Sequence, residues 1–307
     1  MKKIISCCMA FLLSLTVFAS TAYATDKTEL DLTVDAFTVN EFDYILSLQA
    51  ADSATLSTYG LSNTEASRIV REFYTEFDNR ALMTDYDLQG LGYSEQQISL
   101  LRDYAEGATL SNSQMRGLAG TCTGSITAES CNASDAEFSY CWEWDHCPVM
   151  TFQDAAAMRW LAVDSNGHYL DCSKEGVDVD IKYYWNTTYK FLRHGELETG
   201  LEFNTISAQF DVTEIFYSGT TLPEQAYAKK GEITAQVALE QGVTNSIAYM
   251  KVAGLYGHSV VDIGDPSISV DMAMSVSISF TGGLSTDKIA GRQAHVLRGG
   301  TINYQDD

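Results

Sequence analysis

The most constraining feature of this 307-residue sequence is an unbroken alternation of apolar and small, mostly polar residues from Ser267 to Phe280. Ile, Val, Met and Phe occupy every second position, and Ser, Ala and Asp occupy the positions between them. A period of two residues is typical of a β-strand with one apolar and one polar face. The stretch therefore predicts one long strand within a β-rich C-terminal half.

The N-terminus has the pattern of a secretory signal peptide. Lys2 and Lys3 precede an apolar run from Ile4 to Ala19, and Ala22-Tyr23-Ala24 forms a small-x-small cleavage site. We expect removal of residues 1–24 and a secreted, extracellular protein. Because the apolar run is shorter than the ~20 residues of a membrane span, we expect no stable membrane anchor.

The strongly acidic composition limits the classes of partner. The net charge is −22, with 41 acidic and 19 basic residues. Such a charge disfavours binding to nucleic acid and to anionic lipid, because both are negatively charged. The composition fits an acidic extracellular protein. Its ligand is unknown, and we expect a carbohydrate or another protein.

Five cysteines lie beyond the predicted signal peptide. They are Cys122, Cys131, Cys141, Cys147 and Cys172. In an oxidising compartment such a cluster predicts disulfide bonds, although the sequence leaves the pairing open. We therefore interpret residues 119–150 as a cysteine-containing connector.

The string from Cys141 to Cys147, CWEWDHC, holds the densest chemistry of the chain. Its thiols, imidazole and carboxylates could be drawn as a zinc site, but it has no C-x-x-C pair and favours a disulfide instead. Trp142 and Trp144 could stack on a sugar if exposed, so they are weak candidates for ligand contact. Aromatic residues near disulfides are more often part of a core.

Residues 25–118 have the pattern of a small helical unit. Capping-box strings S/T-x-x-E/Q begin at Thr38, Ser62, Ser94 and Ser111, and amphipathic stripes follow them. The stripes are narrow, so we expect the unit to pack on the rest of the chain. Residues 151–307 instead show alternating segments with turn signals between them and no intervening helices. The fold class is therefore predicted as α+β, with a helical N-terminal unit followed by an antiparallel, jelly-roll-like β-sandwich.

The chain resembles uncharacterised secreted proteins of Gram-positive bacteria in layout. The resemblance rests on the signal peptide, on the segment Leu91-Gly-Tyr-Ser-x-x-Gln-Ile98, on the cysteine connector and on Leu255-Tyr-Gly-His-Ser259. It implies export and an α+β arrangement. It supplies no catalytic residues.

No established catalytic motif is present in the sequence. His258-Ser259 followed by Asp262 has the residue types of a hydrolase, but neighbouring side chains on a strand face opposite ways. Glu143 with Asp145, and Glu196 with Glu198, are acidic pairs of the kind found in any acidic protein. Asp262 and Asp265 flank a glycine and could hold Ca²⁺, although an Asp-rich turn needs no ion. We otherwise expect no cofactor.

Three function classes remain. The first is a secreted, non-catalytic binding or cell-surface module. The second is a membrane-active protein of the pore-forming type, because a hairpin with one apolar and one polar face can separate lipid from water. It would need a second strand like Ser267–Phe280, and Ile289–Tyr304 is a poor match. The third is a secreted hydrolase with an unrecognised acidic site.

Overall fold

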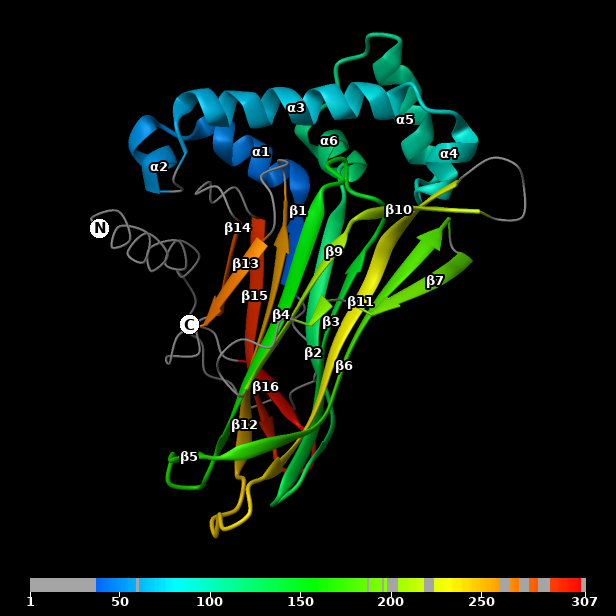
Figure 1. The fold of residues 1–307 in the computed structure, drawn as a ribbon. Helices are drawn as coiled ribbons and strands as arrows, with labels where there is room; N and C mark the ends of the chain where they lie inside the picture. Colours follow the sequence, from blue (N-terminus) through cyan, green and yellow to red (C-terminus); the bar gives the residue numbers. More distant parts are fainter. Residues whose placement is uncertain are drawn as a thin grey trace, which may run out of the picture.

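The computed structural model combines a unit of helices with antiparallel β-sheets, which confirms the α+β class (Figure 1). It describes residues 37–58, 61–186, 188–194, 196–197, 204–217, 224–259, 266–270, 276–280 and 288–304. The helices are α1 (Glu41–Ala50), α2 (Ser53–Thr58), α3 (Asn63–Ala81), α4 (Asp85–Gly90), α5 (Glu95–Ala105) and α6 (Asn112–Leu118). The signal-peptide prediction for residues 1–24 lies outside the described residues.

Three of the four predicted capping boxes are confirmed. Ser62, Ser94 and Ser111 are the N-caps of α3, α5 and α6, and each accepts a hydrogen bond from the N3 backbone N–H. The box predicted at Thr38 is wrong, since Asn40 is the N-cap of α1 and accepts from the N–H of Phe42. The Glu41 side chain instead accepts hydrogen bonds from the backbone N–H groups of Val149 and Met150.

The first of two seven-stranded sheets, sheet A, has the order β1-β2-β3-β11-β6-β7, with β10 paired to β11. Its strands are β1 (Phe37–Asn40), β2 (Thr121–Cys131), β3 (Asp135–Trp144), β6 (Cys172–Trp185), β7 (Thr188–His194), β10 (Thr213–Phe216) and β11 (Glu224–Leu239). Residues 119–150, predicted as a cysteine-containing connector, therefore contain β2 and β3. Small residues fill much of β2, and β3 buries side chains on successive positions, so neither gives a clear period in the sequence.

The second sheet, sheet B, has the order β16-β15-β12-β4-β9-β8, with β5 paired to β4. Its strands are β4 (Gln153–Val163), β5 (Tyr169–Leu170), β8 (Glu196–Leu197), β9 (Thr205–Asp211), β12 (Tyr249–His258), β15 (Lys288–Leu297) and β16 (Ile302–Tyr304). β12 is a central strand, paired with β15 on one side and β4 on the other.

The two sheets pack face to face and enclose an aromatic core. Trp142 of β3 stacks on Phe210 of β9 with ring centroids 5.8 Å apart. Gly254 of β12 faces the ring of Tyr140 so closely that an added Cβ would lie 2.1 Å from it. Glycine at this position is therefore required by the approach of the two sheets. The arrangement is sandwich-like, as predicted.

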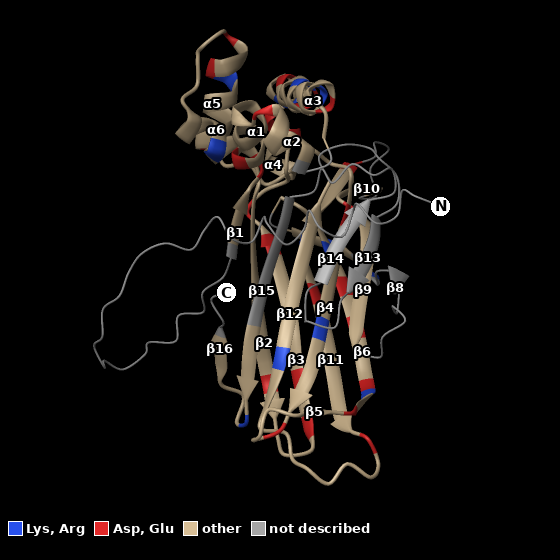
Figure 2. Ribbon diagram, turned by 90° about the vertical axis from the view of Figure 1, so that its left-hand side faces the viewer, with Lys and Arg blue, Asp and Glu red and all other residues tan. Residues whose placement is uncertain are grey.

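The helical unit lies across one end of the sandwich (Figures 1 and 2). Its largest buried stripe belongs to α3, where Ile69, Phe73 and Phe77 are fully buried. Phe73 also contacts Phe42 of α1, with ring centroids 6.0 Å apart. The N-terminal end of α1 continues directly from β1 and so joins the helical unit to sheet A.

The stretch Ser267–Phe280 does not form one long strand. It forms most of a separate two-stranded sheet made by β13 (Pro266–Val270) and β14 (Val276–Phe280), which pair antiparallel. The alternating pattern thus contains its own second strand, and Ile289–Tyr304 supplies β15 and β16 of sheet B instead.

Candidate functional site

The β13–β14 hairpin is inserted between two strands that are themselves paired. β12 and β15 are antiparallel neighbours in sheet B, from Tyr249 opposite Leu297 to His258 opposite Lys288. Residues 259–265 join β12 to β13, and residues 281–287 join β14 to β15, so the two links have equal length. The hairpin is therefore the only paired segment that the structure describes between the two halves of this ladder.

The two ladders share one register. In the β12–β15 ladder every pair lies symmetrically about position 273, including His258 opposite Lys288. In the β13–β14 ladder the pairs from Pro266 opposite Phe280 to Val270 opposite Val276 are symmetric about the same position. The hairpin thus continues the pairing of β12 and β15 without a shift.

The register also sorts the residues of the hairpin by type. Ile268 lies opposite Ile278, whereas Ser267 lies opposite Ser279. The same holds at the next positions, where the pairs are Val270 with Val276 and Ser269 with Ser277. Because alternate residues of a strand belong to opposite faces, the backbone places apolar residues on one face and serines on the other.

The hairpin lies against the outer side of sheet B, away from sheet A (Figure 1). β14 contacts β12 and β4, and β13 contacts β4 and β9. The hairpin strands therefore lie beside sheet B instead of extending the β12–β15 ladder beyond the end of the sandwich.

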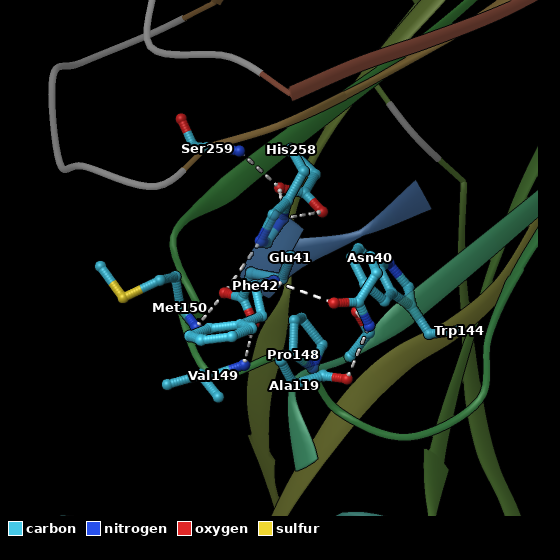
Figure 3. A network of polar contacts seen from close by, with 12 residues as sticks. Asn40, Glu41, Phe42, Ala119, Trp144, Pro148, Val149, Met150, His258 and Ser259 are labelled. Atoms are coloured by element: carbon cyan, nitrogen blue, oxygen red, sulfur yellow. Dashed lines mark hydrogen bonds and ion pairs between the residues drawn. The ribbon is translucent and has the colours of Figure 1, made fainter. Parts of the chain in front are cut away.

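A buried cluster of charged groups lies where the chain leaves β12 (Figure 3). His258, the last residue of β12, donates from Nδ1 to Asp154 Oδ1 of β4 over 2.9 Å. Its Nε2 lies 3.4 Å from Glu41 Oε1, at the start of α1. The next backbone N–H, that of Ser259, donates to Asp154 Oδ1 over 3.1 Å. The helical unit, β4 and β12 are therefore joined at the imidazole ring of His258.

The two carboxylates keep His258 protonated. Burial disfavours the charged imidazole, but the charge and hydrogen bond of Asp154, followed by those of Glu41, raise the pKa of His258 to about 10. Burial likewise disfavours the charged form of Glu41. The contacts with His258 and the backbone N–H groups of Met150 and Val149 outweigh it, so the pKa of Glu41 lies below its ordinary value.

Glu41 connects the cluster to the segment before β4. Its two carboxylate oxygens accept hydrogen bonds from the N–H groups of Val149 and Met150, at 2.8 and 2.7 Å. Arg80 of α3 donates to the carbonyl oxygen of Pro148 over 2.9 Å. Two residues of the helical unit thus hold the backbone that leads into sheet B.

The hydrogen-bond network continues from Asp154 into the aromatic core between the two sheets. Tyr256 donates its hydroxyl hydrogen to Asp154 Oδ2, and Trp144 Nε1 donates to the Tyr256 hydroxyl over 2.9 Å. Asp154 therefore receives donors from His258, from Ser259 and from Tyr256. This satisfies a carboxylate that would otherwise be costly to bury.

The cluster does not have the geometry of a hydrolase. Both ring nitrogens of His258 face carboxylates, so neither remains to activate a hydroxyl group. Ser259 contributes its backbone N–H, and Asp262 lies outside the described residues. The sequence signal for this cluster was an acidic residue, Asp154, next to the apolar run Ala155–Met158 of a central strand.

The two members of the first acidic pair, Glu143 and Asp145, make separate structural contacts. Glu143 forms an ion pair with Lys230 at 2.8 Å, and Asp145 accepts from the backbone N–H of Thr121 at 2.9 Å. The second pair cannot be compared, because Glu198 lies outside the described residues. Within the described part of the chain, no group of three or more His, Cys, Asp or Glu side chains is placed to hold a metal ion. The candidate calcium ligands Asp262 and Asp265 are not among the described residues.

The predicted disulfide bonds are not found, since no two of the five cysteines are bonded to each other. Cys122 and Cys131 stand at opposite ends of β2, about 30 Å apart at the rise of a strand. Cys141 lies opposite Ser125 on the neighbouring strand and contacts Glu232. A disulfide needs two cysteine Cα atoms within about 7 Å of each other. The cysteines are close in the sequence, but their positions on the strands keep them apart in the structure.

Trp142 and Trp144 are core residues. They are 2% and 0% exposed, and both contact the ring of Tyr256. Neither is placed to stack on a ligand at the surface. Exposed aromatic residues are found elsewhere, at Tyr86 on α4 and at Tyr217 after β10. No helix within the described ranges is long and apolar enough to cross a membrane.

Comparisons with known proteins assign no family. No family model matches the sequence, and no curated protein matches it. Among solved structures, AvmM, which catalyses macrocyclization in alchivemycin A biosynthesis, aligns at 12% identity and a TM-score of 0.26, over 59% of this chain and 89% of that one. Clostridium perfringens delta-toxin aligns at 9% identity and a TM-score of 0.21, over 61% of this chain and 88% of that one. At these TM-scores neither likeness carries an argument about fold or function.

Proposed function

We propose that this chain is a secreted, non-catalytic protein that acts on lipid membranes. In this proposal the β13–β14 hairpin leaves the outer side of sheet B, extends the β12–β15 ladder and enters the bilayer. The observation that carries the proposal is the shared register of the two ladders, each symmetric about position 273. Extension therefore requires no new strand pairing within the hairpin.

The sequence pattern of the hairpin suits a strand pair that crosses a bilayer. Even-numbered positions from 266 to 280 are all apolar, and odd-numbered positions are serine, aspartate or alanine. One face could therefore meet lipid while the other meets water. Residues 259–272 and 274–287 lie on either side of the midpoint, and each segment is longer than the ~9–11 residues of a transmembrane strand.

The charge of the chain indicates which membranes to test. A net charge of −22 is repelled by anionic lipid, so neutral phosphatidylcholine vesicles are the appropriate target. We expect the protein to release a trapped dye from such vesicles. The apolar face of the extended hairpin would then lie in the acyl region, where burial of apolar surface is not penalised.

A matched pair of substitutions on β13 tests the proposal. Ile268→Asp places a charge on the apolar face, whereas Ser269→Asp places the same charge on the serine face. A charge facing lipid costs several kcal/mol at the membrane centre, so Ile268→Asp should release dye at least tenfold more slowly than the wild type. Ser269→Asp should stay within about twofold of the wild type, since its face meets water. Equal effects of the two variants, or no release by the wild type, would refute the proposal.

A second candidate function is binding to a carbohydrate through an exposed aromatic surface. We define this aromatic surface as Tyr86, Tyr189 and Tyr217, which are 60%, 49% and 74% exposed. Ring contacts join it to the fold, from Tyr86 to Trp185 at 5.6 Å. Exposed planar rings of this kind can stack on sugars, which supports the alternative of a cell-surface module.

Co-sedimentation with an insoluble polysaccharide separates the two candidates. A carbohydrate-binding module should pellet with the polysaccharide, and Tyr86→Ala with Tyr217→Ala should reduce the bound fraction at least fivefold. Tyr169→Ala is the control, because Tyr169 is equally exposed but lies on β5, away from the aromatic surface. Absence of pelleting would remove this second candidate and leave the membrane proposal to the dye-release test.

A further inference from the structure

The direction in which the chain leaves β12 is fixed at two successive residues. Asp154 accepts from the His258 side chain at 2.9 Å and from the Ser259 backbone N–H at 3.1 Å. Both residues are buried, at 1% and 2% exposure. These are the last described residues before the link to the hairpin, so Asp154 holds the root of the hairpin against β4.

The helical unit reaches the same root through one side chain. Glu41 is completely buried and lies at the first position of α1. It contacts His258 on one side and the backbone of Val149 and Met150 on the other (Figure 3). The strand β12 therefore ends in contact with the helical unit.

We propose that Glu41 is a latch through which the helical unit keeps the β13–β14 hairpin folded back on sheet B. This inference rests on the proposed function, because it concerns the control of the same hairpin. Displacement of the helical unit withdraws Glu41 from His258. The root of the hairpin then loses one of its two carboxylates, and the ladder is free to extend.

Several titratable or charged groups surround His258 and set the response of the latch to pH. Among the side chains that the structure describes, they are Glu41 from α1, Arg80 from α3, Cys147 before β4, Asp154 from β4 and Tyr256 from β12. Two carboxylates beside one imidazole keep the pKa of His258 well above its ordinary value of 6.5. The pKa of Glu41 lies below its ordinary value, so the pair stays ionised in mild acid.

Mild acid is therefore not the trigger of release. A raised histidine pKa gives its full stabilisation below pH 6.5 and loses it only as the pH rises toward about 10. A lowered carboxyl pKa loses its stabilisation only in stronger acid, below the ordinary value of 4.5. The latch is at its tightest between these limits, which leaves removal of the helical unit from the root as the opening event.

The test is Glu41→Gln in the full chain, with Glu76→Gln as a matched control on the exposed side of α3. Hydrogen–deuterium exchange of peptides that cover residues 266–280 reports release of the hairpin without reference to membranes. We expect at least a tenfold faster exchange there in Glu41→Gln, with β2, β3 and β11 unchanged. Glu76→Gln should behave as the wild type. Dye release from phosphatidylcholine vesicles should also accelerate in Glu41→Gln alone.

The two readouts separate the latch from the proposed function. Faster exchange without dye release would support the latch and contradict the membrane proposal. Dye release by the wild type, with exchange and release rates unchanged in Glu41→Gln, would overturn the latch alone. If Glu41→Gln does not fold, Glu41→Asp keeps the charge but draws the carboxylate back from His258. It must then give the same selective rise in exchange, and failure to do so would also overturn the latch.

Discussion

The β12–β15 and β13–β14 ladders have the same register but very different surroundings. β12 is a central strand of sheet B, and its residues from Met250 to His258, apart from Lys251, are buried. The hairpin belongs to neither large sheet and lies on the outer side of sheet B. Strand pairs of one register are thus found in two environments. The β12–β15 pairs belong to the sandwich, whereas the β13–β14 pairs lie on its outer side.

Composition explains the difference between the two ladders. Gly254 and the residues around it fit a strand that is covered on both faces, because even one added Cβ would collide with Tyr140. The hairpin alternates strictly between apolar and mostly small residues, which suits a two-stranded sheet covered on one face only. Contacts on a single face can be exchanged for lipid, whereas an enclosed strand cannot leave without unfolding the sandwich.

The largest expected effect lies at the junction of the two ladders. Asp154→Asn should lower the free energy of unfolding by about 3–5 kcal/mol, because it removes the carboxylate that pairs with a buried, charged His258. Urea denaturation followed by tryptophan fluorescence measures this change. Asp103→Asn, at an exposed position of α5, is the control and should change stability by less than about 0.5 kcal/mol. A loss below about 1 kcal/mol in Asp154→Asn would mean that the junction is not held by this pair.

A second prediction compares the same side chain in both ladders. Gly254→Val should destabilise the protein by about 3 kcal/mol, since the new side chain would enter the ring of Tyr140. Ser269→Val, in the hairpin, should change the free energy of unfolding by less than about 0.5 kcal/mol. Both values come from urea denaturation of the two variants. Equal losses would show that the hairpin is as much a part of the core as β12.

The smallest expected effect is a pH dependence that belongs to the junction. The pKa of His258 is raised from 6.5 to about 10, so the folded state holds an extra proton between these values. The free energy of unfolding should therefore fall as the pH rises from about 7 to 9, by up to about 1.4 kcal/mol per pH unit. Thermal or urea denaturation at a series of pH values measures this slope, and His258→Gln should lose it. A slope that persists in His258→Gln would assign it to another group.

Local signals in the sequence predicted local structure well. The capping boxes at Ser62, Ser94 and Ser111 are confirmed, because a cap depends on residues within one turn. The same string at Thr38 was misleading. There the acidic residue of the box, Glu41, binds the backbone of Val149 and Met150, which no local pattern reveals.

A period of two residues could predict neither the pairing of β13 with β14 nor the buried cluster at His258. Each pair of the hairpin is symmetric about an integer position, so paired residues have the same parity and the alternation runs through the turn without a break. The pattern therefore looks like one long strand. The cluster was missed because Glu41 and His258 are 217 residues apart in the sequence, and Asp154 and His258 are 104 apart.

The central claim is that the hairpin extends the β12–β15 ladder on a membrane, and one distance tests it most directly. Spin-label side chains incorporated at Lys251 and Ser277 avoid reaction with the native thiols. In solution β14 contacts β12, a ten-residue strand about 30 Å long, so the labels should lie within about 30 Å of each other.

On phosphatidylcholine vesicles the extended ladder should move the two labels far apart. Lys251 pairs with His295, and Ser277 would lie on the same continuous strand as His295, about 60 Å away at the rise of a strand. Pulsed electron spin resonance should therefore show an increase from below about 30 Å to about 60 Å. An unchanged distance in vesicles that release their dye would contradict the account.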